Sequence, residues 1–118
     1  MSVLIVDDHA IFRADARELL EFVGYDVIAE ASTAAEGMRQ ARALEPDVVL
    51  LDVQLPDGNG FDTAEEISSR PHPPRIVMVS SREAGDYGTR LHTSPAIGFI
   101  HKPELCRASI VELVGRPS

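Results

Sequence analysis

The sequence predicts an α/β protein in which five parallel strands alternate with helices that cover both faces of a doubly wound sheet. Two observations carry this prediction. Five short apolar runs are spread along the chain, and segments with helical periodicity separate them. One run, Val48–Leu51, is apolar at every position, as expected for a strand covered on both faces. With 118 residues, the chain can bury a core without a disulfide or metal, so we expect one domain over residues 1–118.

The expected elements follow one another as strand and helix from the start of the chain. Strands are expected at residues 2–6, 26–31, 47–51, 75–79 and 96–100. Helices are expected at residues 12–23, 33–44, 61–67 and 103–114, where apolar residues recur at helical spacing. Gly24 supplies a stop for the first helix, Thr33–Glu36 is a capping-box pattern, and Pro46 prevents continuation of the second helix.

The segment between the last two strands is the least regular part of the sequence. Residues 82–95 contain Gly85, Gly88 and Pro95 among several hydroxyl residues. Glycine and proline both disfavour a regular helix. We therefore expect a fourth helix that is short or distorted, around residues 87–92.

Composition excludes several classes of protein. The formal net charge of -8 argues against direct binding of nucleic acid, which needs clustered lysine and arginine. The N-terminus has no positively charged segment and only a short apolar run, so we expect neither a signal peptide nor a membrane span. We therefore expect a soluble cytoplasmic protein. The single cysteine, Cys106, excludes an internal disulfide and is expected to be a buried, inert thiol on the last helix.

Polar residues follow four of the five expected strands. They are Asp7 and Asp8, Asp52, Ser80 and Lys102. The carboxyl ends of parallel strands share one edge of the sheet, where α/β proteins bind ligands. Two carboxylates about 4 Å apart repel by roughly 4 kcal/mol at an effective dielectric constant of about 20, so the cluster calls for a cation. Oxygen ligands with open positions suit Mg²⁺, and one carboxylate could then act as a nucleophile towards a phosphoryl group.

This ordered set of motifs resembles the receiver domain of two-component response regulators, and the resemblance extends from Val3 to about Val114. The motifs that carry it are Asp7-Asp8 after the first strand, Asp52 within Asp-x-x-Leu-Pro-Asp-x-x-Gly, Ser80 after the fourth strand, and Lys102-Pro103 after Gly98-Phe99. The resemblance implies the flavodoxin-like (CheY-like) fold with strand order 2-1-3-4-5. It also implies a phosphorylation-activated signalling switch whose partner is a histidine kinase or a phosphotransfer protein.

The resemblance assigns a role to each matching residue. Asp52 would accept the phosphoryl group. Mg²⁺ would be bound directly by Asp8, by Asp52 and by the backbone carbonyl of Gln54, with Asp7 acting through water. These roles rest on the family pattern.

Three further residues receive roles from the same resemblance. Lys102 would pair with the phosphoryl group, Ser80 would move towards it on activation, and Phe99 stands at the aromatic switch position. The Lys102-Pro103 bond would be cis.

Structural roles compete with these functional ones. Phe99 has the pattern of a core aromatic residue in an apolar strand, and Asp52 could act as a helix cap. His9 is either a metal ligand or an exposed residue at the rim of the site. We expect Asp57 to form a turn with Gly58, and Ser81 to cap a helix.

Other functional classes remain as alternatives. A receiver-like interaction module working without phosphorylation would be expected to lack some of the acidic, hydroxyl or lysine residues, and all are present. A phosphohydrolase resembling the haloacid dehalogenase class would need an aspartate two residues after Asp52, where Gln54 stands, so we expect no enzyme beyond the protein's own phosphoryl transfer and dephosphorylation.

The wider architecture also has alternatives. The opening Val6-Asp7-Asp8-His9 is similar to receivers attached to helix-turn-helix DNA-binding domains. The chain is then either a receiver-only regulator or the N-terminal part of such a protein. A homodimer is compatible with the family, but the irregular residues 82–95 argue against a standard dimer through that face.

Overall fold

The computed structural model describes residues 1–117 and is built around one sheet of five parallel strands. The strands are β1 (Ser2–Val6), β2 (Asp26–Ala31), β3 (Val48–Asp52), β6 (Arg75–Ser80) and β7 (Gly98–His101). Their order across the sheet is β2-β1-β3-β6-β7. Numbered by chain order among these five strands, this is 2-1-3-4-5, so the predicted fold is confirmed.

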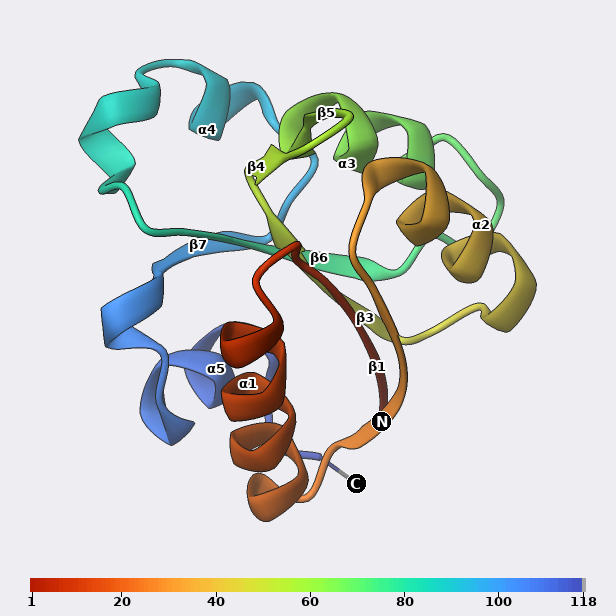
Figure 1. Ribbon diagram of the computed structural model, residues 1–118, viewed down its shortest axis with the longest axis vertical. Coiled ribbons are helices and arrows are strands. Elements are labelled where there is room, and N and C mark those ends of the chain that lie inside the picture. The colour runs from red at the N-terminus through yellow and green to blue at the C-terminus, as the bar shows by residue number, and fades with distance from the viewer. Residues whose placement is uncertain (118) are drawn as a thin grey trace.

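Helices cover both faces of the sheet (Figure 1). They are α1 (Ala10–Val23), α2 (Ala34–Leu44), α3 (Gly60–Ser68), α4 (Arg90–Thr93) and α5 (Arg107–Val114), with 3₁₀ turns η1 (Ala84–Tyr87) and η2 (Lys102–Glu104). Helices α1 and α5 lie on one face, and α2 and α3 lie on the other. The sheet is therefore doubly wound, as predicted.

Alternate residues of the strands supply two separate cores, because successive side chains of a strand point to opposite faces. In β1, Val3 and Ile5 pack with the residues of α1 and α5. Leu4 and Val6 pack with those of α2 and α3. All five residues of β3 are buried, which confirms that this strand is covered on both sides and delivers its last residue, Asp52, to the sheet edge.

The helix ends follow the signals in the sequence. Gly24 ends α1 in the left-handed region, with φ of 116°, where a side chain would be strained. The Thr33 side chain accepts a hydrogen bond from the Glu36 amide at 3.1 Å and so caps α2. The predicted ends of these helices are confirmed.

The loop after β3 contains a small hairpin that the sequence did not predict. It pairs β4 (Gln54–Leu55) with β5 (Gly58–Asn59) and brings the chain back beneath Asp52. At Gly60, a Cβ atom would lie 2.3 Å from the backbone oxygen of Asp52, so this position requires glycine. Asp57 accepts hydrogen bonds from the amides of Ala34 and Ala35, at 2.7 and 3.0 Å, and thereby ties the loop to the start of α2.

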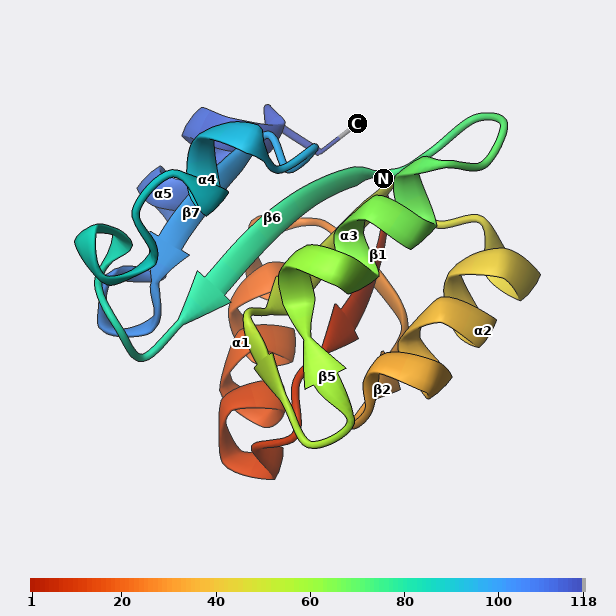
Figure 2. The same ribbon diagram turned by 90° about the horizontal axis from the view of Figure 1, so that it is seen from above.

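Residues 82–95 form only the turn η1 and the four-residue helix α4, which confirms the predicted irregularity. Figure 2 shows this segment at the β6–β7 side of the sheet, away from α2. None of the residues from Ser81 to Phe99, all of which the structure describes, is buried.

Three predictions near the end of the chain and beside η1 were wrong. Cys106 is exposed and precedes α5 as its N-cap, because the last helix begins four residues later than predicted. The Lys102-Pro103 bond is trans, as are all described peptide bonds, and Pro103 lies within the one-turn helix η2. Ser81 does not cap η1, whose N-cap is Glu83.

Candidate functional site

The carboxyl ends of β1, β3 and β7 bring two acids and one amine into contact. Lys102 Nζ, just after β7, lies 2.7 Å from Asp7 Oδ2 and 3.3 Å from Asp52 Oδ2. The side chains of Asp7, Asp52 and Lys102 are respectively 0%, 3% and 12% exposed. The site is therefore a buried cluster of two carboxylates neutralised in part by one ammonium group.

Asp52 has an unusual environment for a carboxylate. Its Oδ1 accepts a hydrogen bond from the Gln54 amide at 3.2 Å, and its Oδ2 faces Lys102. Burial, followed by the neighbouring charge of Asp7, raises the pKa of Asp52 to about 6, although Lys102 opposes the shift. A carboxylate held in this way gains from any further positive charge placed beside it.

Asp7 is a second buried carboxylate with a need for positive charge. Its Oδ1 accepts a hydrogen bond from the His9 amide at 2.8 Å. Its Oδ2 is fully buried and, among the described residues, accepts no hydrogen bond, because Lys102 at 2.7 Å approaches it as an ion pair without hydrogen-bond geometry. The short distance places opposite charges in contact, and the oxygen still has lone pairs free for a cation.

The residues of the site fit a bound divalent cation. Asp7, Asp8, His9 and Asp52 each offer a ligand atom, and these atoms all lie within 4.8 Å of one another. Three of the four donors are carboxylates, which suits a hard cation such as Mg²⁺. Gln54, predicted as a further ligand through its backbone carbonyl, lies in β4 directly after the acid-bearing strand.

The structure places His9 at the edge of the acidic cluster. Its side chain is 63% exposed, so it lies at the rim of the site. Its Nδ1 nevertheless lies 3.1 Å from Asp7 Oδ1 and 3.3 Å from Asp8 Oδ1, within reach of a cation held between these acids. Lys102 Nζ is also 3.3 Å from this nitrogen.

Phe12, at the start of the helix predicted over residues 12–23, also contacts the candidate site. The ammonium group of Lys102 lies 4.5 Å from the centre of its ring, a cation–π distance. The contact adds an aromatic neighbour to the two acids that hold the lysine. Helical spacing alone gives no signal for it, because Phe12 also packs against the α1 core.

Ser80 does not join Asp52 directly. Its side chain is buried at the end of β6 and accepts a hydrogen bond from the Arg82 amide at 3.0 Å. The same hydroxyl is hydrogen-bonded to the hydroxyl of Tyr87. Within residues 1–117, no hydrogen bond connects Ser80 with Asp52.

Phe99 lies beside the same tyrosine. Its ring is half-buried and its centre is 5.9 Å from that of Tyr87. The structure therefore links the two predicted switch residues, Ser80 and Phe99, through a third side chain. Tyr87 was missed as a site residue because it falls in the irregular segment, where the sequence shows no periodicity.

Fold and site together define an α/β protein with a cluster of acids at the carboxyl edge of its sheet, in an arrangement that fits a cation. Comparison with protein families then identifies the class: residues 3–114 match the response regulator receiver domain. The chain belongs to this family.

Curated relatives agree with the family. The chain is 35% identical over 101 residues to the transcriptional regulatory protein PdtaR of Mycobacterium tuberculosis, covering 86% of this chain and 49% of that protein. It is 31% identical over 104 residues to the DNA-binding transcriptional activator EvgA of Escherichia coli, covering 88% of this chain and 51% of that protein. The chain thus spans about half the length of these relatives.

Solved structures support the same fold. A two-component response regulator of the LuxR family from Aurantimonas sp. matches with a TM-score of 0.83 and 31% identity, covering 98% of this chain and 86% of that one. The response regulator domain of Thermotoga maritima CheB matches with a TM-score of 0.83 and 25% identity, covering 97% of this chain and 92% of that one.

In the described residues, no helix is long and apolar enough to cross a membrane.

Proposed function

We propose that this chain is a phosphorylation-activated switch of a two-component phosphorelay, with Asp52 as the phosphoacceptor. The observation that carries the proposal is the placement of Asp52. It lies buried at the tip of β3, beside the ammonium group of Lys102 and close to the acids Asp7 and Asp8. A structural carboxylate would not need such a cluster, whereas a carboxylate that receives a phosphoryl group does.

The chemistry follows from the geometry. A carboxylate oxygen of Asp52 attacks phosphorus, a new O–P bond forms, and the P–N bond to the donor histidine breaks. The electron pair of that bond stays with the imidazole of the donor, which takes up a proton. Asp52 must be ionised to attack, and Lys102, together with a bound cation, favours this form against the opposing effects of burial and Asp7.

Lys102 is proposed to balance charge on the transferred group. Its Nζ is within 3.3 Å of Asp52 and is held by Phe12, so it need not be reoriented over a long distance. A fixed cation beside developing negative charge lowers the barrier to transfer.

Mg²⁺ is proposed as the cofactor, held by Asp8, Asp52 and the carbonyl of Gln54, with Asp7 acting through water. When bound, it supplies positive charge to the phosphoryl oxygens. The buried Oδ2 of Asp7, which accepts no hydrogen bond among the described residues, and the convergence of four donors support this assignment.

The proposed partner is a histidine kinase or a phosphotransfer protein of the cytoplasm, as family membership suggests. Relatives named as a DNA-binding activator and a transcriptional regulator suggest that the output is control of transcription, exerted through a segment or partner outside this domain. The net charge of -8 supports the view that residues 1–118 do not themselves bind nucleic acid.

Acetyl phosphate with Mg²⁺ tests the phosphoacceptor directly. We expect the intact wild-type protein to gain the mass of one phosphoryl group, with release of acetate. Asp52→Asn should gain none, because the amide is not a nucleophile of this kind, and Asp15→Asn, at an exposed position of α1, should still react as a matched control. A wild-type protein that stays unmodified across a range of Mg²⁺ concentrations would instead favour an interaction module working without phosphorylation.

A Mg²⁺ titration tests the metal site separately. We expect Asp8→Ala to weaken Mg²⁺ binding by at least tenfold, since it removes one of few charged ligands. Asp62→Ala, which removes an exposed acid outside the site, is the control and should bind Mg²⁺ as the wild type does. Equal affinities of Asp8→Ala and wild type would remove Asp8 from the metal site.

A further inference from the structure

Tyr87 occupies a position between the candidate site and the irregular segment. It ends the turn η1, and its hydroxyl is hydrogen-bonded to Ser80 Oγ at the tip of β6. The Arg82 amide donates to the same Ser80 oxygen at 3.0 Å. Ser80 is therefore held by two groups that both belong to the segment following β6.

The ring of Tyr87 is held on two sides by aromatic residues. The centre of the Phe61 ring, on α3, is 5.6 Å away with an edge-on geometry, and that of the Phe99 ring, on β7, is 5.9 Å away. Because the rings fix its direction, the phenol hydroxyl is directed to Ser80 at little cost in side-chain entropy. Few other contacts hold η1, since none of its residues is buried.

We infer that Tyr87 is a positioning residue: its hydroxyl holds the Ser80 hydroxyl away from Asp52 in the unphosphorylated protein and releases it when Asp52 carries a phosphoryl group. This inference rests on the proposed function and deepens it. It assigns the resting position of Ser80 to one named hydrogen bond.

The release has a physical cause. The hydrogen bond with Tyr87 fixes the Ser80 hydroxyl at a position where, among the described residues, it makes no hydrogen bond to Asp52, so Ser80 must leave Tyr87 to reach a phosphoryl oxygen. A hydrogen bond to an anionic oxygen is about twice as strong as one between neutral groups. The phosphoryl oxygens therefore compete successfully for Ser80, and Tyr87 loses its partner.

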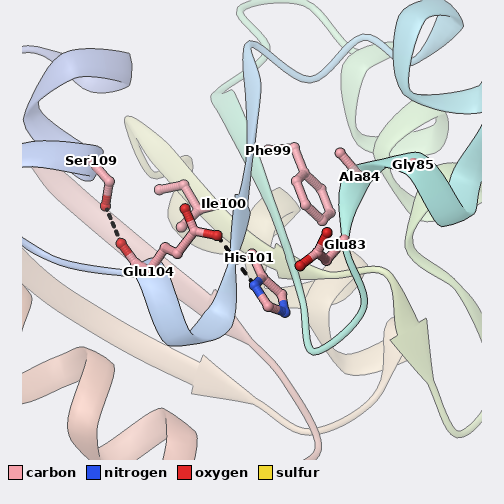
Figure 3. A pocket seen from close by; sticks show the side chains of 8 residues that line it. All are labelled: Glu83, Ala84, Gly85, Phe99, Ile100, His101, Glu104 and Ser109. Carbon is pink, nitrogen blue, oxygen red and sulfur yellow. Dashed lines mark hydrogen bonds and ion pairs between the residues drawn. The ribbon is translucent and has the colours of Figure 1, made fainter.

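Loss of this bond affects a cavity that Phe99 helps to line. The cavity has a volume of about 380 Å³ and lies between η1 and β7. Figure 3 shows Glu83, Ala84 and Gly85 of one wall facing Phe99 of the other. Since η1 carries Tyr87 and this wall, release of Tyr87 changes the shape of the cavity, and the state of Asp52 is transmitted to the surface.

Binding of beryllium fluoride with Mg²⁺, a mimic of a phosphoryl group on a carboxylate, tests the inference by calorimetry. Tyr87→Phe keeps the ring and removes only the hydroxyl. We expect it to bind about fivefold more tightly than wild type, because a neutral hydrogen bond that opposes the active state is lost. Tyr25→Phe removes the other tyrosine hydroxyl, which is bonded to the Gly115 carbonyl, and should leave the affinity unchanged.

A double-mutant cycle shows whether the effect passes through Ser80. In a Ser80→Ala background, Tyr87→Phe should no longer change the affinity, because its partner is absent. An affinity of Tyr87→Phe equal to or weaker than that of wild type would overturn the inference, as would the same gain with and without Ser80. A wild-type protein that binds no beryllium fluoride would remove the proposed function itself, so the two failures differ.

Tyrosine fluorescence supplies a second readout. The chain contains two tyrosines and no tryptophan, so the Tyr25→Phe variant emits from Tyr87 alone. We expect its emission to change when beryllium fluoride and Mg²⁺ bind, and to remain constant when Ser80→Ala is added. Constant emission in the variant that retains Ser80, with binding shown by calorimetry, would overturn the inference.

Discussion

The two ends of the candidate site differ in how firmly the fold holds them. Asp7 and Asp52 are fully or almost fully buried on strands of the sheet centre, and the loop after Asp52 is tied to α2 through Asp57. By contrast, the segment from Ser81 to Phe99 has no buried residue. The acceptor end of the site is rigid, and the segment that follows Ser80 is held by few contacts.

This difference assigns separate tasks to the two regions. Chemistry needs ligands fixed to within a fraction of an ångström, which strand ends provide. A switch needs an element with a small free energy of opening, and segments with few buried contacts have this property. The same edge of the sheet therefore carries a candidate site held by buried residues beside a segment with no buried residue.

The largest expected effect on the free energy of unfolding comes from removing the ammonium group of Lys102. Without Mg²⁺, Lys102→Ala should lower the free energy of unfolding by on the order of 3 kcal/mol, because Asp7 and Asp52 would face each other without a counter-charge. Urea unfolding in a chelating buffer measures the loss. Millimolar Mg²⁺ should restore most of it, and a loss that Mg²⁺ leaves unchanged would show that the lysine acts through packing alone.

A smaller effect is expected from the protonation of Asp52, which makes the free energy of unfolding depend on pH. Because the pKa of Asp52 in the fold is about 6, against an ordinary value of 3.8, the folded protein binds more protons than the unfolded chain between these values. Unfolding free energy contributed by Asp52 is therefore present below pH 4 and is lost as the pH rises through about 6. Relative to metal-free Asp52→Asn, metal-free wild type should lose on the order of 2 kcal/mol across this window. Parallel pH profiles of the two proteins would contradict the raised pKa.

The smallest effect is expected in the irregular segment. Arg90 pairs with Asp62 at 3.1 Å, but the two side chains are 49% and 70% exposed. Arg90→Ala should therefore change the free energy of unfolding by less than about 1 kcal/mol. This variant is the surface counterpart of Lys102→Ala, since each removes one cation beside a carboxylate. Equal losses in urea unfolding would abolish the contrast between the two regions.

Much of the fold could be predicted because local and global signals agree. The apolar run before Asp52, the glycine at residue 24 and the cap at Thr33 each point to the element that forms. The hairpin after β3 could not be predicted, since strands of two residues carry no periodicity. The start of the last helix was placed too early because Pro103 is equally suited to open a 3₁₀ turn.

The site could be predicted in its composition but not in its contacts. Strand ends bring Asp7, Asp52 and Lys102 together by topology alone, so their order in the chain was sufficient. The contact of Ser80 with Tyr87 depends on the path of an irregular segment, which has no repeating pattern to read. The same holds for the ring of Phe12 beneath Lys102, because a helical face can serve a core and a site at once.

The close approach of Gly60 to the backbone of Asp52 has a consequence for how this protein can vary. After Asp52 the chain forms the β4–β5 hairpin and returns at Gly60 to contact the Asp52 backbone. The length of the loop between these two residues is therefore fixed. One residue added within residues 53–59 would have to bulge outward or push the acceptor from its place. Domain insertions and circular permutation should therefore be tolerated in the loop of residues 69–74, whose residues are mostly exposed, and rejected here.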